Sequence, residues 1–346
     1  MKIAVGMSGG VDSTACALLM SRVGHEVIGI TLRFHKICDG ERVCCSPQDV
    51  KDASRVANLL GISHLVIDWE ELFRQRVVDR FLGFSSRGKT LNPCAVCNRD
   101  VKTGFLARYL RDVAMIDRLA TGHYARIVDF KSFRVIARAK DRAKDQSYFL
   151  ALLRAEDIEL LEFPLGDMTK DEIRELLRSE GIDIWDKRDS QDVCFFMGKS
   201  LSEYLEENIG AIEGELVFEN RVLARHSSIF SLTIGQRKGL GVAFGEALYV
   251  KEIDPCAKRV LLSKKEELYK SEIELESLSL HLPISQWGKV FAQVRYRGEL
   301  SEVEDIIQTN GGTLVRFKKP VWAPAPGQVC AFYEGDVLLG GGIIAR

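Results

Sequence analysis

The sequence lacks any apolar stretch long enough to cross a membrane. A spanning helix needs roughly 20 consecutive apolar residues, and no run in this chain approaches that length. No targeting pattern precedes the first strand-like run, which starts almost directly after Met1. Proline is scarce, at 8 of 346 residues, and there is no internal repeat. We therefore expect a cytoplasmic protein with no membrane partner, and its length predicts two or three domains.

Net charge is also nearly absent, because 48 Lys and Arg stand against 49 Asp and Glu. This balance excludes a global electrostatic attraction to nucleic acid, so any RNA site must come from local clustering. One basic cluster runs from Arg126 to Lys144, with seven basic residues and only two acidic ones. It has two interpretations, an RNA-binding surface and a solvated basic hairpin.

Strand-like apolar runs alternate with helical periods in the first part of the chain. The runs cover residues 2–7, 27–32, 63–69 and 118–124, and the first helical periods cover residues 14–23 and 47–60. This alternation predicts an α/β fold with a doubly wound parallel sheet, whose ligand site lies at the carboxyl ends of the strands. Between residues 125 and 139, two β-branched runs flank Lys131-Ser132 and predict a hairpin projecting from that sheet.

The remainder of the chain is predicted to be mostly β. Thr169 with Glu172, and Ser200 with Glu203, form capping boxes that start two helices. From about residue 210, short strands separated by glycine-containing turns indicate an all-β region. We predict a catalytic α/β domain over residues 1–200, a small β-rich linking domain over 201–266 and a C-terminal β-barrel over 267–346.

A glycine-rich turn, residues 8–13 (Ser-Gly-Gly-Val-Asp-Ser), joins the first strand to the first helix. Its glycines let backbone amides turn inward, and the helix N-terminus adds unpaired N–H groups, so the turn predicts a pyrophosphate site. An ordinary strand-to-helix turn is the alternative. The turn lacks the Gly-Lys-Ser/Thr ending of a Walker A loop and the glycine pattern of a dinucleotide fold. Asp12 is a candidate Mg²⁺ ligand or a partner of the helix dipole.

This turn resembles the loop of the PP-loop ATP pyrophosphatases, which cleave ATP between the α and β phosphates. These enzymes activate an oxygen atom as its adenylate. Some form amides and others insert sulfur into tRNA, and only the second class requires thiols. The cysteines of the chain therefore bear on the choice.

Nine cysteines, in a chain with no secretory signal, indicate redox, metal or sulfur-transfer chemistry. We predict structural roles for Cys16, Cys256 and Cys330. The other six fall into three groups, which are Cys38, Cys44 and Cys45, then Cys94 and Cys97, then Cys194. In sulfur insertion, a cysteine persulfide supplies the sulfur, and a second cysteine attacks the S–S bond to release it.

Five segments together resemble the tRNA 2-thiouridylases of the MnmA family nearly end to end. They are residues 6–13, 122–126, 144–150, 233–241 and 339–344. The family installs 2-thiouridine at the wobble position of the tRNAs for Lys, Glu and Gln. The resemblance implies that the chain uses ATP and Mg²⁺, binds these tRNAs, and receives sulfur from a persulfide donor such as a cysteine desulfurase or its relay.

The resemblance also implies roles for single residues. Cys97 would be the nucleophile that pairs with Cys194, and Cys194 would carry the persulfide. The residues touching the target base would be Asn92, Pro93 and Cys94. Those contacting ATP would be Gly6, Met7, Ser8, Gly9, Gly10, Val11, Asp12, Ser13, Leu32 and Gly122. Those contacting tRNA would be His123, Lys144, Asp145, Gln146, Arg295, Tyr296 and Gln328.

From the residues alone, several of these positions keep other interpretations. His123 could be a hydrogen-bonded packing residue. Arg295 and Tyr296 could be opposite faces of one strand. Residues 144–146 could cap the next helix. For Cys97, which follows a helix-starting proline segment, we expect a lowered pKa.

Cys94 departs from the family pattern, in which Asn-Pro-Asp precedes the nucleophile. With Cys97 and Cys194 it could hold a [4Fe-4S] cluster with one iron open to sulfide. Cys94 and Cys97 could instead form a redox pair, or Cys94 could only contact the base. A separate group of Cys38, Cys44 and Cys45 could bind zinc with His35, although a substrate-covering loop is the alternative.

Two other functions remain as alternatives. An adenylate-forming amide synthetase, such as an argininosuccinate or NAD synthetase, would need neither thiols nor a barrel for RNA. A non-catalytic RNA-binding or sulfur-carrier protein would need no intact phosphate loop, and the loop of this chain is intact.

Overall fold

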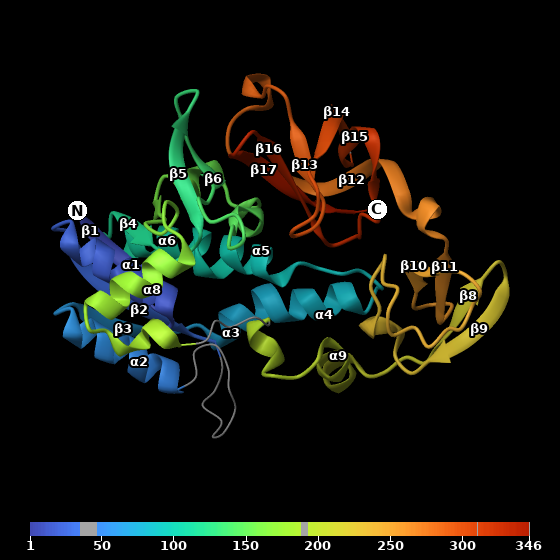
Figure 1. Cartoon of the computed structure of the whole chain (residues 1–346), viewed down its shortest axis with the longest axis horizontal. Coiled ribbons are helices and arrows are strands. Elements are labelled where there is room, and N and C mark those ends of the chain that lie inside the picture. The colour runs from blue at the N-terminus through green and yellow to red at the C-terminus, as the bar shows by residue number, and fades with distance from the viewer. Residues whose placement is uncertain (35–46, 188–192, 310, 346) are drawn as a thin grey trace.

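The computed structural model of the chain describes residues 1–34, 47–187, 193–309 and 311–345. Three parts follow one another along the chain (Figure 1): an N-terminal α/β part, a small β-rich middle part and a C-terminal β-rich part. Among the described residues, no helix is long and apolar enough to span a bilayer.

A five-stranded parallel sheet organises the N-terminal part. Its strands are β1 (Lys2–Gly6), β2 (Glu26–Arg33), β3 (Ser63–Asp68), β4 (Arg118–Ala120) and β7 (Leu161–Glu162). They lie in the order β3-β2-β1-β4-β7, so the order reverses between β1 and β4. In such a sheet, ligands bind outside the carboxyl ends of the strands at this reversal. β4 ends at Ala120, earlier than predicted, because the following residues leave the sheet for this site.

Helices cover both faces of this sheet, which confirms the doubly wound fold. They include α1 (Val11–Arg22), α2 (Pro47–Leu59), α6 (Gly104–Ala114) and α8 (Lys170–Ser179). Because successive strand residues face opposite sides, Ile3 and Val5 pack with α1, α2 and α8. Ala4 packs with the apolar residues of α6 on the other side.

Two interrupted helices carry the chain past the carboxyl end of the sheet. The first runs through α3 (Glu70–Phe73), the π-helical turn η1 (Arg74–Val78) and α4 (Asp79–Ser85). The second runs through α5 (Pro93–Cys97) and the π-helical turn η2 (Asn98–Lys102) into α6. The Asn92 side chain caps α5 by accepting from the Ala95 N–H at 3.1 Å, and proline suits the first helical position. π-turns are rare and are frequent at functional sites.

Short helices complete this part and the later connections. They are α7 (Ala155–Ile158), η3 (Ser147–Leu150), η4 (Asp183–Asp186), η5 (Cys194–Phe196), η6 (Ile229–Ser231), η7 (Lys265–Leu268) and η8 (Ile284–Gln286). Both predicted capping boxes are confirmed, at the starts of α8 and of α9 (Leu201–Ile209).

The middle and C-terminal parts are β-rich, as predicted. The middle part contains β8 (Gly214–Phe218), β9 (Arg221–His226), β10 (Tyr249–Asp254) and β11 (Arg259–Ser263), in the order β10-β11-β8-β9. The C-terminal strands are β12 (Tyr269–Leu280), β13 (Phe291–Gln293), β14 (Ser301–Thr309), β15 (Gly312–Trp322), β16 (Val329–Glu334) and β17 (Val337–Ile344). Because β12 pairs with both β15 and β17, these six strands close into a barrel.

The hairpin predicted over residues 125–139 exists, but it does not project alone from the first sheet. Its strands are β5 (Ala125–Phe130) and β6 (Phe133–Arg138), and Lys131 and Ser132 both have positive φ, as a tight hairpin turn requires. β6 pairs with β17 through Ile136 and Leu338. The hairpin therefore extends the C-terminal sheet and joins the first and last parts of the chain.

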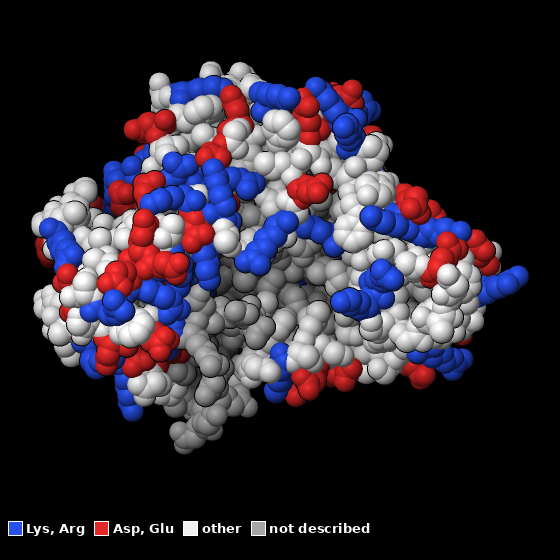
Figure 2. All heavy atoms as spheres, viewed as in Figure 1, with Lys and Arg blue, Asp and Glu red and all other residues white. Residues whose placement is uncertain are grey.

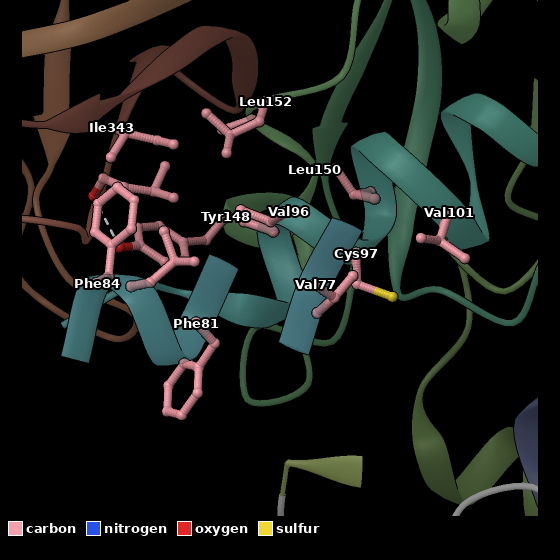
Figure 3. Packing of buried hydrophobic residues seen from close by; sticks show 14 of the residues in the cluster. Val77, Phe81, Phe84, Val96, Cys97, Val101, Tyr148, Leu150, Leu152 and Ile343 are labelled. Atoms are coloured by element: carbon pink, nitrogen blue, oxygen red, sulfur yellow. Dashed lines mark hydrogen bonds between the residues drawn. The ribbon is translucent and has the colours of Figure 1, made fainter. Parts of the chain in front are cut away.

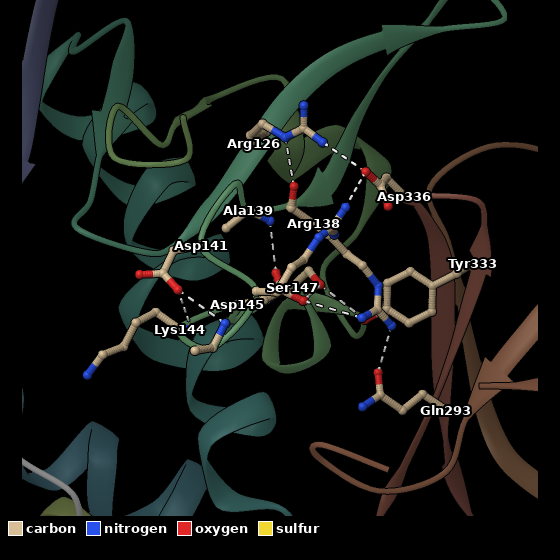
Figure 4. A network of polar contacts seen from close by, with 12 residues as sticks. Arg126, Arg138, Ala139, Asp141, Lys144, Asp145, Ser147, Gln293, Tyr333 and Asp336 are labelled. Atoms are coloured by element: carbon tan, nitrogen blue, oxygen red, sulfur yellow. Dashed lines mark hydrogen bonds and ion pairs between the residues drawn. The ribbon is translucent and has the colours of Figure 1, made fainter. Parts of the chain in front are cut away.

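The basic cluster of this hairpin region fits neither sequence interpretation fully. At least six of its basic side chains make ion pairs: Arg126, Lys131, Arg134, Arg138, Lys140 and Arg142. Figure 4 shows Asp336 of the C-terminal part next to Arg126, and Arg138 between Asp145 and Tyr333. Most of these cations therefore connect parts of the protein.

One large apolar core also crosses between the parts. Figure 3 shows Phe84 and Tyr148 of the N-terminal part beside Ile343 of β17. The Tyr148 hydroxyl donates to the Val329 carbonyl at 2.8 Å. The C-terminal barrel is thus packed against the helices that lead to the carboxyl end of the first sheet.

Candidate active site

A cavity of about 180 Å³ lies where the two interrupted helices pass the carboxyl end of the sheet. It is lined by residues from five separate segments, namely Phe73, Val77, Pro93, Cys94, Cys97, Asn98, Lys102, His123, Gln146, Phe149, Val193, Cys194 and Phe195. The fold thus brings Cys94 and Cys97 together with Cys194, which lies about 100 positions further along the sequence. The same cavity contains two of the residues predicted to contact tRNA, His123 and Gln146.

Cys97 is the most enclosed of these three thiols, with 5% of its surface exposed. Figure 3 shows it at the edge of the apolar cluster beside Val77. Burial raises the pKa of the Cys97 thiol, although the charge of Lys102 acts in the opposite direction. The predicted lowering of this pKa is therefore wrong. Cys97 is the last residue of α5, so it does not lie over the unpaired N–H groups that lower thiol pKa values at helix N-termini.

Cys194 begins the 3₁₀ turn η5 and is half-buried in the cavity wall. Phe195 anchors this turn, because its ring packs at 6.0 Å from that of Phe73 and at 5.4 Å from that of Phe81. Cys94, by contrast, is exposed. Cys97 and Cys194 lie close enough for the charge of Cys194 to add to the rise in the Cys97 pKa.

The thiols do not form a metal site in the part of the chain that the structure describes. Within residues 1–34, 47–187, 193–309 and 311–345, no group of three or more His, Cys, Asp or Glu side chains is placed to hold a metal ion. The cavity as it stands therefore does not fit a cluster held by Cys94, Cys97 and Cys194. The other predicted metal ligands, His35, Cys38, Cys44 and Cys45, lie outside the described residues.

The phosphate loop follows β1 and is held by its own serines. Ser13 Oγ accepts from the Ser8 N–H at 3.1 Å and donates to the Gly10 carbonyl at 3.1 Å. Gly9 has φ +69°, and Gly10 is the N-cap of α1 without a side chain to cap it. A helix start that lacks a side-chain cap presents amides and a favourable dipole to an anion. The loop therefore has the form that the sequence predicts for a pyrophosphate site.

Asp12 lies in the first turn of α1 and is already hydrogen-bonded. Its Oδ1 accepts from the Tyr124 hydroxyl at 2.7 Å and from the Lys170 ammonium at 2.8 Å. Lys170 was not predicted to be a site residue, although the Thr169 capping box places it at the first position of α8. Gly122 packs on the Asp12 backbone so closely that a Cβ atom there would lie 2.8 Å from the Asp12 carbonyl carbon. This contact accounts for the glycine beside the phosphate loop.

His123 connects the phosphate loop with the thiol cavity. It follows Gly122, lines the cavity and shares a hydrogen bond of 2.8 Å between Nδ1 and the Thr121 hydroxyl. Burial, assisted by the charge of Lys102, lowers the pKa of His123 to about 4. The imidazole is therefore neutral at physiological pH. Gly122 packs on the phosphate loop and His123 lines the thiol cavity, so the two places are linked by consecutive residues of the chain.

Four of the predicted RNA contacts, Asp145, Gln146, Arg295 and Tyr296, are engaged inside the protein. Asp145 accepts from the Ala139 N–H and from Ser147, and Gln146 accepts from the Tyr124 N–H at 2.9 Å. The Arg295 guanidinium donates to the Ala323 and Ile234 carbonyls. The Tyr296 ring lies 4.4 Å from that of Phe149.

Gln328 has a comparable supporting position. Its amide donates to the Thr90 carbonyl at 2.9 Å, and the Asn92 N–H donates to the Gly327 carbonyl at 3.2 Å. The C-terminal barrel therefore holds the segment that starts α5 and carries Cys94 and Cys97.

Three family models match consecutive parts of the chain. They are described as the tRNA methyl transferase HUP domain over residues 1–198, the tRNA methyl transferase PRC-barrel domain over 199–264 and the aminomethyltransferase beta-barrel domain over 270–344. The first of these models alone covers more than half of the chain.

Three relatives, each described as tRNA-specific 2-thiouridylase MnmA, match along nearly their whole length. The protein from Aquifex aeolicus is 52% identical over 99% of this chain and 99% of its own. That from Persephonella marina is 45% identical over 99% and 100%, and that from a Hydrogenobaculum species is 44% identical over 100% and 100%. The resemblance drawn from the sequence motifs is thereby confirmed, and the chain belongs to the MnmA family of tRNA-specific 2-thiouridylases.

Proposed function

We propose that the chain is a tRNA-uridine 2-sulfurtransferase that converts the wobble uridine, position 34, to 2-thiouridine with consumption of ATP. The observation that carries this proposal is that two consecutive residues link the phosphate loop and the thiols: Gly122 packs on Asp12 of the loop, and His123 lines the cavity that holds Cys97 and Cys194. An amide synthetase would have no use for the thiols, and the relatives do not favour that alternative or a non-catalytic protein.

The first step activates an oxygen. The C2 oxygen of uridine attacks the α-phosphorus of ATP, and the bond to the β-phosphate oxygen breaks, so that pyrophosphate leaves and C2 carries an AMP group. The phosphate loop binds the leaving pyrophosphate through backbone amides. Bound Mg²⁺ would neutralise phosphate charge, and Asp12 would hold it through Oδ2, since Oδ1 already accepts from Tyr124 and Lys170.

The second step replaces that oxygen with sulfur. A persulfide on Cys194 attacks C2 through its terminal sulfur, the C2–O bond breaks and AMP leaves. The Cys97 thiolate then attacks the Cys194 sulfur, the S–S bond to the transferred atom breaks, and that sulfur stays on C2. The N3 proton that uridine loses on activation is regained from solvent when the C2 thiolate becomes the thiocarbonyl of 2-thiouridine. A Cys97–Cys194 disulfide remains, which an external thiol must reduce before the next turnover.

Lys102 supplies the positive charge that this chemistry needs at a buried thiol. It lines the same cavity as Cys97 and opposes the effect of burial on the Cys97 pKa. Neutral His123 is available as a hydrogen-bonding group between the adenylated base and the thiols. These two side chains, with Cys97, would act on the base while Asn92, Pro93 and Cys94 contact it.

The RNA substrate would lie across the hollow between the N-terminal and middle parts. Figure 2 shows Lys and Arg side chains bordering this hollow, and phosphate contacts of such side chains orient RNA without reading its sequence. By family membership, the substrates would be the tRNAs for Lys, Glu and Gln. The sulfur would come from a cysteine desulfurase or its relay, and a tRNA substrate is consistent with a cytoplasmic reaction.

Mass spectrometry of nucleosides from tRNA tests this function. The enzyme, ATP, Mg²⁺ and a persulfide donor should convert wobble uridine to 2-thiouridine. Cys194→Ser should abolish the product and retain tRNA-dependent exchange of pyrophosphate into ATP, because activation precedes sulfur transfer. Cys256→Ser, which changes an exposed cysteine far along the chain, is the matched control and should keep full activity. Thiolation that survives in Cys194→Ser would refute the persulfide role.

The presence of Cys94 suggests an alternative, in which an iron–sulfur cluster delivers the sulfur. Because the thiols do not form a metal-holding group among the described residues, we assign the transfer to the persulfide. Anaerobic purification with iron analysis and an absorption spectrum separates the two routes. Full activity of iron-free protein would support the persulfide route. Activity that rises with iron content and is lost in Cys94→Ser would contradict the persulfide route and support the cluster.

A further inference from the structure

Lys187 lies outside the active-site cavity and yet contacts the phosphate loop. Its ammonium donates to the Gly9 carbonyl at 2.9 Å, to Asp49 at 2.7 Å and to Asp52 at 2.8 Å. The two aspartates belong to the first turns of α2, and Lys187 follows η4. One side chain therefore connects three separate segments of the N-terminal part at the loop.

The contact with Gly9 fixes the direction of one peptide plane. In a trans peptide the carbonyl and the following N–H point in opposite directions, so the Gly10 N–H points away from Lys187. The near side of the loop is filled, because a Cβ atom on Gly9 would lie 2.3 Å from the Asp49 carbonyl oxygen. A phosphate must therefore approach from the opposite side, which is the side that the Gly10 N–H faces.

The charges of Lys187, Asp49 and Asp52 also affect phosphate binding. Asp49 and Asp52 are largely enclosed, with 20% and 14% of their side chains exposed, and Lys187 is 33% exposed. Without the lysine, two carboxylates with reduced access to water would face a loop that must accept a polyanion. Enclosed charges interact over longer distances than exposed ones because solvent screens them less. Lys187 therefore reduces a repulsion that would otherwise weaken phosphate binding.

We propose that Lys187 is a positioning residue for the phosphates of ATP, which holds the Gly10 amide toward them and offsets part of the negative charge of Asp49 and Asp52. This inference rests on the proposed use of ATP. Lys187 does not touch the reacting atoms, and it acts through the Gly9–Gly10 peptide and through the two aspartates.

Calorimetric binding of α,β-methylene-ATP with Mg²⁺ to the full chain tests the proposal without turnover. Lys187→Met should weaken binding by about 10- to 100-fold, the range for a lost hydrogen bond to a charged group. Lys187→Arg should retain part of the affinity that Lys187→Met loses. Steady-state kinetics should show a raised KM for ATP and an unchanged KM for tRNA, a division that general destabilisation would not produce.

Arg55→Met is the matched control. Arg55 pairs with Asp183 at 2.7 Å and thereby joins the same two regions, α2 and η4, without touching the phosphate loop. Arg55 has the smallest of the effects that lower the Asp52 pKa, so its removal should leave analogue binding within about 2-fold, as is common for exposed ion pairs. An equal loss of binding in both variants would mean that Lys187 only stabilises the fold, and the proposal would be wrong.

The double variant Lys187→Met/Asp52→Asn tests the electrostatic half of the proposal. It should bind the analogue more tightly than Lys187→Met, because one repelling carboxylate is gone. No recovery in the double variant would overturn the neutralising role. If the unaltered protein fails to bind the analogue, the proposed function fails, whereas equal binding by the unaltered protein and Lys187→Met overturns this inference alone.

Discussion

Cys94 and Cys97 lie on one short helix and differ in how far water reaches them. Cys94 is exposed, and Cys97 is buried with a pKa raised by that burial. The nucleophile that we propose is thus a protonated thiol in the resting protein. Its thiolate would form when the substrates occupy the cavity and Lys102 balances the charge.

This contrast predicts the order of chemical modification. Iodoacetamide should label Cys94 before Cys97 at pH 7, because only the thiolate reacts and burial disfavours it in Cys97. The labelling rate of Cys97 should continue to rise when the pH exceeds 9, the ordinary pKa of a thiol, because burial raises the pKa of Cys97. Peptide mapping by mass spectrometry measures both rates, and buried Cys16 and Cys330 serve as unreactive references. Equal labelling of Cys97 and Cys94 at pH 7 would contradict the assignment.

The sequence identified the residues of the site better than their environments. The spacing of Cys94 and Cys97 and the distant Cys194 were enough to predict sulfur chemistry. The pKa of Cys97 was predicted in the wrong direction, because it depends on Phe73 and Val77 from another helix and on where α5 ends. Lys170 and Lys187 were missed for the same reason, since each contacts the phosphate loop from more than 150 positions away.

At the scale of elements, the hairpin β5–β6 is the junction between the first and last parts of the chain. Its local signals, two β-branched runs and a turn at residues 131–132, predicted the element correctly. Its partner could not be predicted, because Ile136 and Leu338 meet across 200 positions and no local pattern encodes that pairing. Two of the hairpin's basic residues, Arg126 and Lys131, pair with acids on the C-terminal part.

Buried apolar contacts, rather than these ion pairs, should hold the hairpin in place. Leu338→Ala removes a fully buried side chain and should lower the free energy of unfolding by about 2 to 5 kcal/mol. Asp336→Asn breaks exposed pairs with Arg126 and Arg142 and should cost about 1 kcal/mol or less. Urea unfolding followed by circular dichroism compares the variants. A larger loss in Asp336→Asn than in Leu338→Ala would show that the ion pairs dominate.

For the whole molecule, the predicted fold class is confirmed: a doubly wound sheet, then a small β-rich part, then a barrel. The domain limits at 200, 201–266 and 267 stay a prediction. The hairpin illustrates why limits are difficult to read from a sequence, since residues 125–138 precede the first limit and yet pair with the last sheet.

The arrangement of the parts also explains why one chain can perform both chemical steps. The barrel supports the segment before α5 through Gln328 and Gly327, and the sheet presents the phosphate loop. Gly122 and His123 occupy the short interval between them. Activation and sulfur transfer can thus act on one uridine without its release.

The most direct test of this account follows the oxygen atom that uridine loses. Transfer RNA carrying ¹⁸O at C2 of the wobble uridine is incubated with the enzyme, ATP, Mg²⁺ and a persulfide donor, and the AMP is analysed by mass spectrometry. The account predicts one ¹⁸O in AMP for each 2-thiouridine formed, because the C2 oxygen leaves bonded to the α-phosphorus. Thiouridine that forms while the AMP stays unlabelled would contradict it.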